Sequence, residues 1–280
     1  MIDAGFLQEL DRFRVIMKKH IHSKYSGDRE SKTSGSGLTF RDHRKYERGD
    51  DVRTVDWRVY ARTEEYIIKR YEEERNMQVH IVIDSSGSMN YGQKFDYASM
   101  IGLGFAYIGL KNNEKFEIST FNETLEKFKP RKGATQINSL ITQLNNVKLQ
   151  GTSKFSECLK QYKQAIKSKS FVVIISDCLF DISEIKNALS LFKKSDVILI
   201  QVLDKTEKDL SLNGDVVLTD LERPLSKIRT FIGARLKQNY QNKLTKHIAE
   251  IKNVCDTLGV KFASVSTDTP VFDVFYDVLN

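Results

Sequence analysis

Cysteine and proline are scarce in this sequence of 280 residues, which contains three of each. The cysteines, Cys158, Cys178 and Cys255, are odd in number, and none forms a CxxC pair or a cysteine–histidine spacing typical of a metal site. The sequence therefore predicts free thiols in a reducing, cytoplasmic compartment rather than a disulfide framework. Its three prolines and fifteen glycines also exclude a collagen-like or low-complexity chain.

Long apolar runs are missing as well. The longest, residues 100–110, is about half of the ~20 residues that a membrane-spanning helix needs. The N-terminal segment contains no basic stretch leading into an apolar one, so we expect neither a secretory signal nor membrane insertion. The 44 lysines and arginines exceed the 37 aspartates and glutamates by 7, but the two signs are interleaved. This pattern favours an ordinary solvated surface over nucleic-acid binding.

Strand-like and helix-like segments alternate between residues 77 and 203. This alternation predicts an α/β domain on a doubly wound, mostly parallel sheet with helices on both faces. The predicted strands are residues 78–83, 115–121, 125–128, 171–176 and 197–203, and the predicted helices are residues 95–110, 134–147, 154–166 and 182–192. We expect residues 204–280 to complete the same domain, with strands at 215–218 and 260–265 and helices at 235–258 and 271–279.

We expect residues 1–76 to form an N-terminal helix and a charged segment that pack on this core. Apolar residues recur at helical spacing through residues 2–21, residues 23–37 are typical of a loop, and residues 66–71 have the composition of a strand. In the charged segment, Arg53 and Asp56 are candidates for an ion pair with Trp57 packed beneath. The alternative is a partner-docking surface built on arginine and aromatic anchors.

Two of the buried strands end in aspartate. The first runs into Asp84-x-Ser86-x-Ser88, the second is followed by Asp177, and a Gly-Thr loop with Thr152 precedes a helix. Ligands of doubly wound sheets bind at the carboxyl ends of strands, where the strand order reverses. Carboxylates and hydroxyls are hard oxygen donors, so this combination predicts a site for Mg²⁺, or for Mn²⁺ or Ca²⁺.

These motifs resemble the von Willebrand factor type A (VWA) domain and its metal-ion-dependent adhesion site (MIDAS). The resemblance implies that Ser86, Ser88 and Thr152 bind the metal directly, and that Asp84 and Asp177 bind it directly or through water. A metal held by few charged ligands stays electrophilic and can accept a carboxylate in an open position. Such a site captures an acidic side chain of a protein partner and performs no bond chemistry.

The segment before the first predicted strand of the α/β domain indicates a more specific family resemblance. Residues 46–57 carry the pattern Tyr-x-x-Gly-Asp-Asp-x-Arg-x-x-Asp-Trp. With it, the chain from about residue 40 onward resembles the bacterial family catalogued as domain of unknown function fifty-eight. Members of that family often lie beside MoxR-type AAA+ ATPases. The resemblance therefore implies a MoxR-type ATPase, or a substrate of that ATPase, as the protein partner.

Two other functions remain open. A nucleic-acid-binding protein would use the basic N-terminal third, through Arg41, Arg44, Lys45, Arg48, Arg53, Arg58 and Arg62. A metal-assisted hydrolase would use the cation to activate water. However, no Gly-x-Ser-x-Gly elbow is present and no histidine is paired by spacing with a nucleophile, so we expect no catalytic residues and no enzyme. We expect His80 to be a packed core residue and His247 to lie on a solvated face.

Overall fold

A computed structural model describes residues 6, 9, 10, 38–73, 78–111, 114–128, 135–166, 168–222 and 226–279. The chain divides into two compact units, residues 1–21 with 77–280 and residues 22–76, which are described separately. The expected domain boundaries, and the packing of residues 1–76 on the core, stay predictions. Of the predicted helix at 2–21, the described Phe6 and Leu10 are buried, and the Phe6 ring lies 5.9 Å from that of Phe272. The loop predicted at 23–37 lies outside the described residues.

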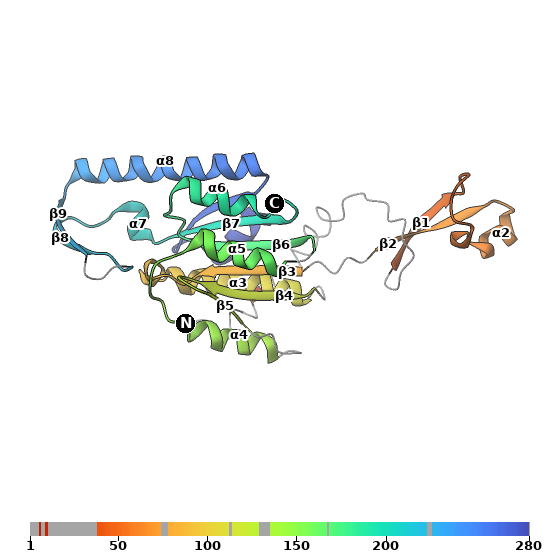
Figure 1. The fold of residues 1–280 in the computed structure, drawn as a ribbon, viewed down its shortest axis with the longest axis horizontal. Coiled ribbons are helices and arrows are strands. Elements are labelled where there is room, and N and C mark those ends of the chain that lie inside the picture. The colour runs from red at the N-terminus through yellow and green to blue at the C-terminus, as the bar shows by residue number, and fades with distance from the viewer. Residues whose placement is uncertain are drawn as a thin grey trace. The chain divides into compact units, whose positions relative to one another are not determined.

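The larger unit is built on a six-stranded sheet in the order β10-β7-β6-β3-β4-β5 (Figure 1). The strands are β3 (Gln78–Asp84), β4 (Phe116–Phe121), β5 (Leu125–Lys127), β6 (Ser170–Ser176), β7 (Asp196–Leu203) and β10 (Lys261–Ser266). All neighbouring pairs are parallel except β4 and β5, which form an antiparallel hairpin. Since the buried runs of β3, β6 and β7 lack an alternating polar face, both faces of the sheet must be covered.

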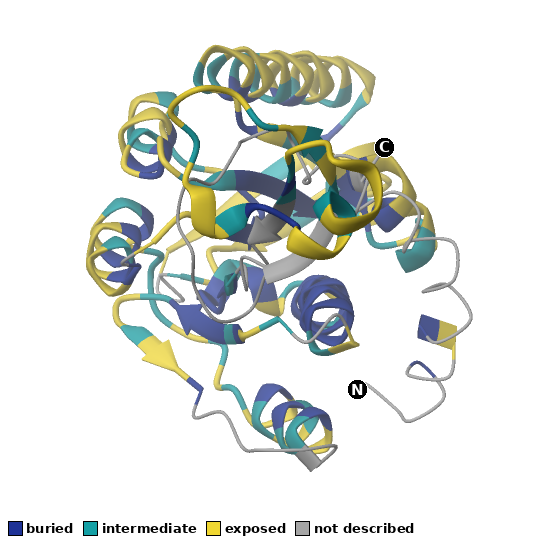
Figure 2. Cartoon of the chain, turned by 90° about the vertical axis from the view of Figure 1, so that its right-hand side faces the viewer, coloured by how far each residue is buried: buried dark blue, intermediate teal, exposed yellow. Residues whose placement is uncertain are grey.

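Helices cover both faces of this sheet. In β3, Val82 belongs to a core cluster shared with α5 (Phe155–Ala165), α6 (Ile182–Ser190) and α8 (Ala234–Leu258). Its neighbours Ile81 and Ile83 point to the opposite face, because side chains alternate along a strand, and they contact α3 (Lys94–Lys111). The helices α4 (Thr135–Asn145) and α9 (Val271–Leu279) pack against α3. Buried residues, dark blue in Figure 2, concentrate on the strands and on the helix surfaces that face them.

Small residues allow α3 to approach the sheet closely. A Cβ atom on Gly102 would lie only 2.7 Å from the Cδ1 atom of Ile83, and one on Gly104 would lie 2.2 Å from the Phe275 ring of α9. Glycine weakens a helix interior, but here it lets two layers pack at a distance that alanine would prevent. The doubly wound, mostly parallel α/β fold is thus confirmed. Among the described helices, none has the length and apolar character needed to cross a membrane.

A hairpin and a short helix connect β7 to α8. The connection contains α7 (Lys205–Asp209), β8 (Gly214–Thr219) and β9 (Lys227–Ile232), and β8 pairs with β9 in a separate antiparallel sheet. Asp204 caps α7 through a capping box with Glu207. In Figure 1 the hairpin lies beyond the carboxyl ends of the central strands. The first strand of this hairpin was predicted from sequence, and the second was not.

The smaller unit contains an antiparallel pair, β1 (Leu38–Lys45) and β2 (Ile67–Glu73), with a 3-10 turn at Val52–Thr54 and the helix α2 (Trp57–Thr63) between them. Asp56 caps α2, and its Oδ2 atom pairs with His43 (3.1 Å) and Lys69 (3.3 Å) rather than with Arg53. Trp57 is 53% exposed. The predicted Arg53–Asp56 ion pair with Trp57 packed beneath is therefore wrong, because Asp56 faces His43 and Lys69 on the two strands and Trp57 is largely exposed.

His80 is a packed core residue, as predicted, and this has a consequence for acid stability. The ring lies in β3, is 1% exposed, and pairs through Nδ1 with the Tyr162 hydroxyl at 2.9 Å. Burial, which disfavours the charged ring, lowers the pKa of His80 to about 4. Between pH 6.5 and about 4 the unfolded chain therefore takes up a proton that the folded protein excludes. The folded state should lose about 3 kcal/mol of stability as the pH falls through this window.

Urea unfolding of the wild type and of a His80→Gln variant, measured above and below this window, checks the prediction. Glutamine keeps a polar group at the same position but does not titrate. We expect the variant to lose markedly less stability than the wild type on acidification, since all other titrating groups are shared. Equal losses in the two proteins would contradict the assignment of this acid sensitivity to His80.

Candidate metal centre

The predicted site residues lie at the point where the strand order of the sheet reverses. In the sheet, β4 and β5 lie on one side of β3, and the later strands β6, β7 and β10 lie on its other side. β3 and β6 are parallel neighbours, so the end of β3 at Asp84 and the residue after β6, Asp177, lie at the same edge of the sheet. Crevices at such switch points are the usual ligand-binding places of doubly wound folds.

Asp84 is completely buried, and both of its carboxylate oxygens accept hydrogen bonds. Its Oδ1 atom accepts from the backbone N–H of Ser86 at 2.9 Å, and its Oδ2 atom accepts from the hydroxyls of Ser176 (2.8 Å) and Ser153 (3.1 Å). Burial, followed by repulsion from the Asp177 carboxylate, raises the pKa of Asp84 to about 7. A buried carboxylate under this repulsion is stabilised by a nearby cation.

The two serines of the motif converge. The 3-10 turn η2 (Gly87–Asn90) begins directly after Ser86 and brings the Ser86 and Ser88 hydroxyl oxygens to 3.1 Å from each other. Two adjacent ligands of an octahedral Mg²⁺ ion, each about 2.1 Å from the metal, lie about 3.0 Å apart. The spacing of these hydroxyls therefore fits one edge of such an octahedron.

The glycine–threonine loop lies against this turn. The backbone N–H of Gly87 donates to the carbonyl of Gly151 at 2.9 Å, and the next loop residue but one, Ser153, is the residue bonded to Asp84. For Thr152 the structure shows a hydrogen bond from its backbone N–H to Glu123 at 3.4 Å. The loop is thus beside the motif as predicted, and Ser153 provides a hydroxyl that no sequence pattern indicates. Its only sequence signal is its place next to Thr152.

Asp177 has a partner that no sequence pattern indicates. The Nζ atom of Lys94, which begins α3, lies 3.1 Å from Asp177 Oδ2 and 2.8 Å from Glu207 Oε1. The Lys94 side chain is 0% exposed. Burial alone would lower the pKa of this lysine, but the two carboxylates together raise it above its usual value. Lys94 thus neutralises part of the negative charge at the strand ends.

The residue after Asp177 connects the site to α8. Cys178 is buried and adopts a left-handed backbone conformation (φ 53°), which costs free energy for a residue other than glycine. Its carbonyl accepts a hydrogen bond from His247 Nε2 at 2.8 Å. The expectation that His247 lies on a solvated face is therefore wrong, because α8 passes close to the end of β6. The expectation of three free cysteines is confirmed, and all three are buried.

The donor set suits a hard divalent cation. Among the described residues, no three histidine, cysteine, aspartate or glutamate side chains form a group that could hold one ion. A metal here would therefore depend on serine and threonine hydroxyls together with Asp84 and Asp177, which is a set for Mg²⁺, Mn²⁺ or Ca²⁺ rather than for zinc or copper. The buried carboxylates and the spacing of the serine hydroxyls fit such an ion.

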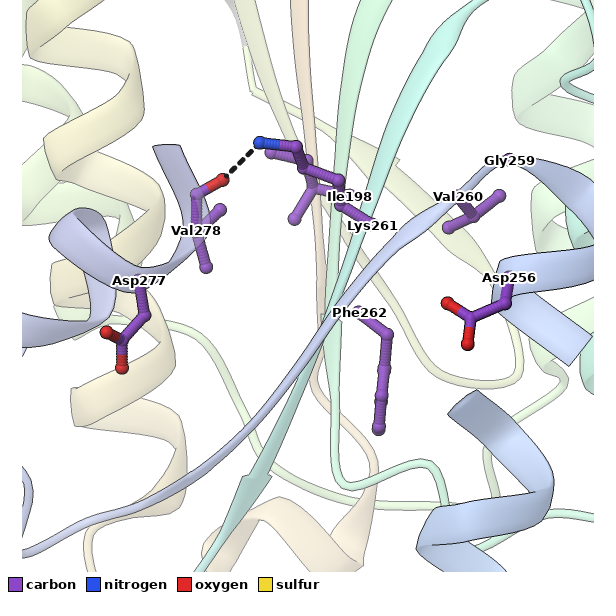
Figure 3. A pocket seen from close by; sticks show the side chains of 8 residues that line it. All are labelled: Ile198, Asp256, Gly259, Val260, Lys261, Phe262, Asp277 and Val278. Carbon is purple, nitrogen blue, oxygen red and sulfur yellow. Dashed lines mark hydrogen bonds between the residues drawn. The ribbon is translucent and has the colours of Figure 1, made fainter. Parts of the chain in front are cut away.

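Two other places are less suited to a ligand. A pocket of about 440 Å³ lies where β10 begins, away from the carboxyl ends of the strands, with Asp256 and Asp277 on opposite sides of Phe262 (Figure 3).

In the smaller unit, Arg44 pairs with Asp50 at 2.9 Å and Lys45 pairs with Glu65 at 3.1 Å. These ion pairs reduce the positive charge that the alternative function, nucleic-acid binding, would need for contacts to phosphates.

Comparison with known proteins gives a family match. The family described as "Protein of unknown function DUF58" matches residues 42–250. Uncharacterized proteins from Mycobacterium tuberculosis (strain H37Rv) and Mycobacterium bovis are each 23% identical over 275 residues, which is 95% of this chain and 86% of the relative.

Solved structures that match part of this chain include two from Bacteroides. The conserved hypothetical protein BatB from Bacteroides thetaiotaomicron is 13% identical and has a TM-score of 0.44, over 72% of this chain and 97% of that one. An aerotolerance-related membrane protein from Bacteroides fragilis is 13% identical with a TM-score of 0.41, over 73% and 98%. The SpRpn10 VWA domain is 11% identical with a TM-score of 0.44, over 72% and 94%.

Proposed function

We infer the function from the premise that this chain belongs to the DUF58 family. We propose that it is a cytoplasmic protein-interaction module whose binding site is completed by a divalent cation, Mg²⁺ in the first place. The observation that carries the proposal is the convergence of Ser86 and Ser88, 3.1 Å apart, beside the buried Asp84 at the switch point of the sheet. The MIDAS-like motif in the sequence assigns the same residues to a metal.

The residues have distinct roles under this proposal. Ser86, Ser88 and Thr152 would bind the cation with neutral hydroxyls, and Asp84 and Asp177 would supply the negative charge directly or through water. The bound cation would supply a Lewis-acidic position for an acidic side chain of the partner. The chain itself holds the loop and the strand ends in register, through the Gly87–Gly151 and Ser153–Asp84 hydrogen bonds.

The partner that fits the family resemblance is a MoxR-type AAA+ ATPase or one of its substrates. The test is binding of the purified chain to the purified MoxR-type ATPase of the same genome, measured in Mg²⁺ and in EDTA. We expect binding in Mg²⁺ that is lost in EDTA and in an Asp84→Ala variant. Equal, strong binding in all three conditions would exclude metal-mediated capture. Phosphoester turnover that disappears in an Asp177→Ala variant would instead favour a metal-assisted hydrolase.

A further inference from the structure

The turn between β8 and β9 lies directly on the metal motif. A Cβ atom on Gly87 would lie 2.3 Å from the carbonyl oxygen of Leu221 and 3.2 Å from the Cα atom of Glu222. Any residue other than glycine at position 87 would therefore collide with the backbone of this turn. More than a hundred residues of sequence separate the two segments, so this contact is invisible in the sequence pattern.

The Glu222 carboxylate faces the same group of oxygen donors. It accepts hydrogen bonds from the Ser88 hydroxyl and from the backbone N–H of Ser153, and it lies within electrostatic range of Asp177. Its own backbone N–H is held by Asp220 Oδ1 at 2.9 Å, which fixes the turn. The Glu222 carboxylate therefore lies beside Ser88, one of the residues of the Asp84-x-Ser86-x-Ser88 motif.

Little else holds the hairpin in this position. Ile232 is the one buried residue of β8 and β9, all of whose residues the structure describes, while Val217, Ile228 and Phe231 are 60%, 63% and 67% exposed. An element with few buried apolar contacts opens at low cost in free energy. The hairpin can therefore leave the site without disturbing the central sheet, and its exposed apolar residues are available to a protein that displaces it.

We propose that Glu222 is an internal ligand of the metal site, with Asp84 and Asp177 acting through water, and that it occupies the position that a partner's acidic side chain takes after displacing the β8–β9 turn. This inference rests on the proposed metal-binding function. A tethered carboxylate acts at an effective concentration in the millimolar range or above, so a weak or isolated external carboxylate competes poorly with it. Only a partner that also binds the hairpin gains enough to replace it. Glu222 thus sets the specificity of the site.

The test uses Mn²⁺ as the metal and acetate as the external carboxylate, with the full chain. Mn²⁺ affinity is measured by electron paramagnetic resonance, and metal-bound water by water-proton relaxation. In a Glu222→Gln variant we expect Mn²⁺ affinity to fall about tenfold, since one carboxylate is lost. We expect the variant to show stronger water-proton relaxation than the wild type, because water enters the position that Glu222 leaves. We also expect acetate to displace this water from the variant at a concentration about tenfold lower than the wild type requires.

Asp215→Asn is the matched control. It removes one charge from the same hairpin, at an exposed position paired with Arg229 and outside the described contacts of the site. It should behave as the wild type. Gly87→Ala provides a second variant that keeps every oxygen ligand but pushes the turn away, and it should reproduce the increase in relaxation. Failure of the wild type to bind Mn²⁺ overturns the metal function itself. Normal Mn²⁺ binding with no difference between wild type and Glu222→Gln overturns only the internal ligand.

Discussion

An Asp84→Asn variant should bind Mg²⁺ or Mn²⁺ at least about a hundredfold more weakly than the wild type, since even residues outside the direct ligands change metal affinity 10–100-fold. Asparagine has the same shape as aspartate and keeps an oxygen acceptor for the N–H of Ser86, and the Ser153 and Ser176 hydroxyls can rotate to suit an amide. The weaker metal binding would therefore result from the missing negative charge of Asp84 and not from a change in the structure of the site. Isothermal titration with each metal measures it.

The same variant should be more stable than the wild type when no metal is present, although most core substitutions destabilise. The folded pKa of Asp84 is raised to about 7 from 3.8, so the folded state binds the proton more tightly than the unfolded state. Stability contributed by this proton is present below pH 3.8 and is lost as the pH rises through 7. Asparagine does not titrate, so the gain should appear at pH 8 and vanish near pH 4.

Urea unfolding in EDTA at both pH values measures this effect. Asp181→Asn, an exposed aspartate that precedes α6 and makes no side-chain capping bond, is the matched control and should change neither stability nor metal affinity. An Asp84→Asn protein that binds Mg²⁺ as tightly as the wild type would remove Asp84 from the ligand set. A variant that is less stable at pH 8 would show that the carboxylate is not under repulsion.

Replacing Lys94 with methionine should lower the free energy of unfolding by about 3–5 kcal/mol, measured in EDTA. The Nζ atom is fully buried between Asp177 and Glu207, at 3.1 and 2.8 Å. Methionine fills a similar volume but leaves two carboxylates, one of them 2% exposed, without their cation. The destabilisation comes from these unpaired charges more than from the loss of an attractive contact.

Two further variants isolate this cause. Adding Glu207→Gln to Lys94→Met should recover part of the loss, because one of the two unpaired charges is then absent. Lys205→Met removes a lysine of the neighbouring α7 that is 64% exposed and lies 3.6 Å from Asp268, and it should change stability by less than about 0.5 kcal/mol. A loss below about 1 kcal/mol for Lys94→Met, or no recovery in the double variant, would contradict this account.

Residues that act through local sequence were predictable. Asp84, Ser86 and Ser88 follow a buried strand with alternating spacing, and the end of that strand fixes where they lie. Lys94, Ser153 and Glu222 were missed because their roles depend on contacts between segments far apart in the chain. A lysine at the start of a helix is normally solvated, and nothing near Lys94 in the sequence indicates that Asp177 and Glu207 meet there.

The central sheet could be predicted better than the elements around it. A continuous run of β-branched residues such as residues 171–176 strongly favours a buried strand, and the structure has β6 at this place. In contrast, β1 consists mainly of charged residues, and β9 and α2 are only six and seven residues long, so periodicity does not identify them. His247 was assigned to solvent because the polar composition of α8 does not show which of its turns passes the end of β6.

The shortness of β5 has a consequence for self-association. This outermost strand has three residues, two of them charged, and Lys127 pairs with Glu117 on β4 at 3.3 Å. Because β5 is so short and carries charged side chains, it exposes few unpaired backbone groups, and a second chain can hardly add a strand to it. Beneath it, β4 is buried at every position but one. Truncation or local opening of β5 would uncover the backbone edge of the six-residue β4, to which a second chain could add a strand.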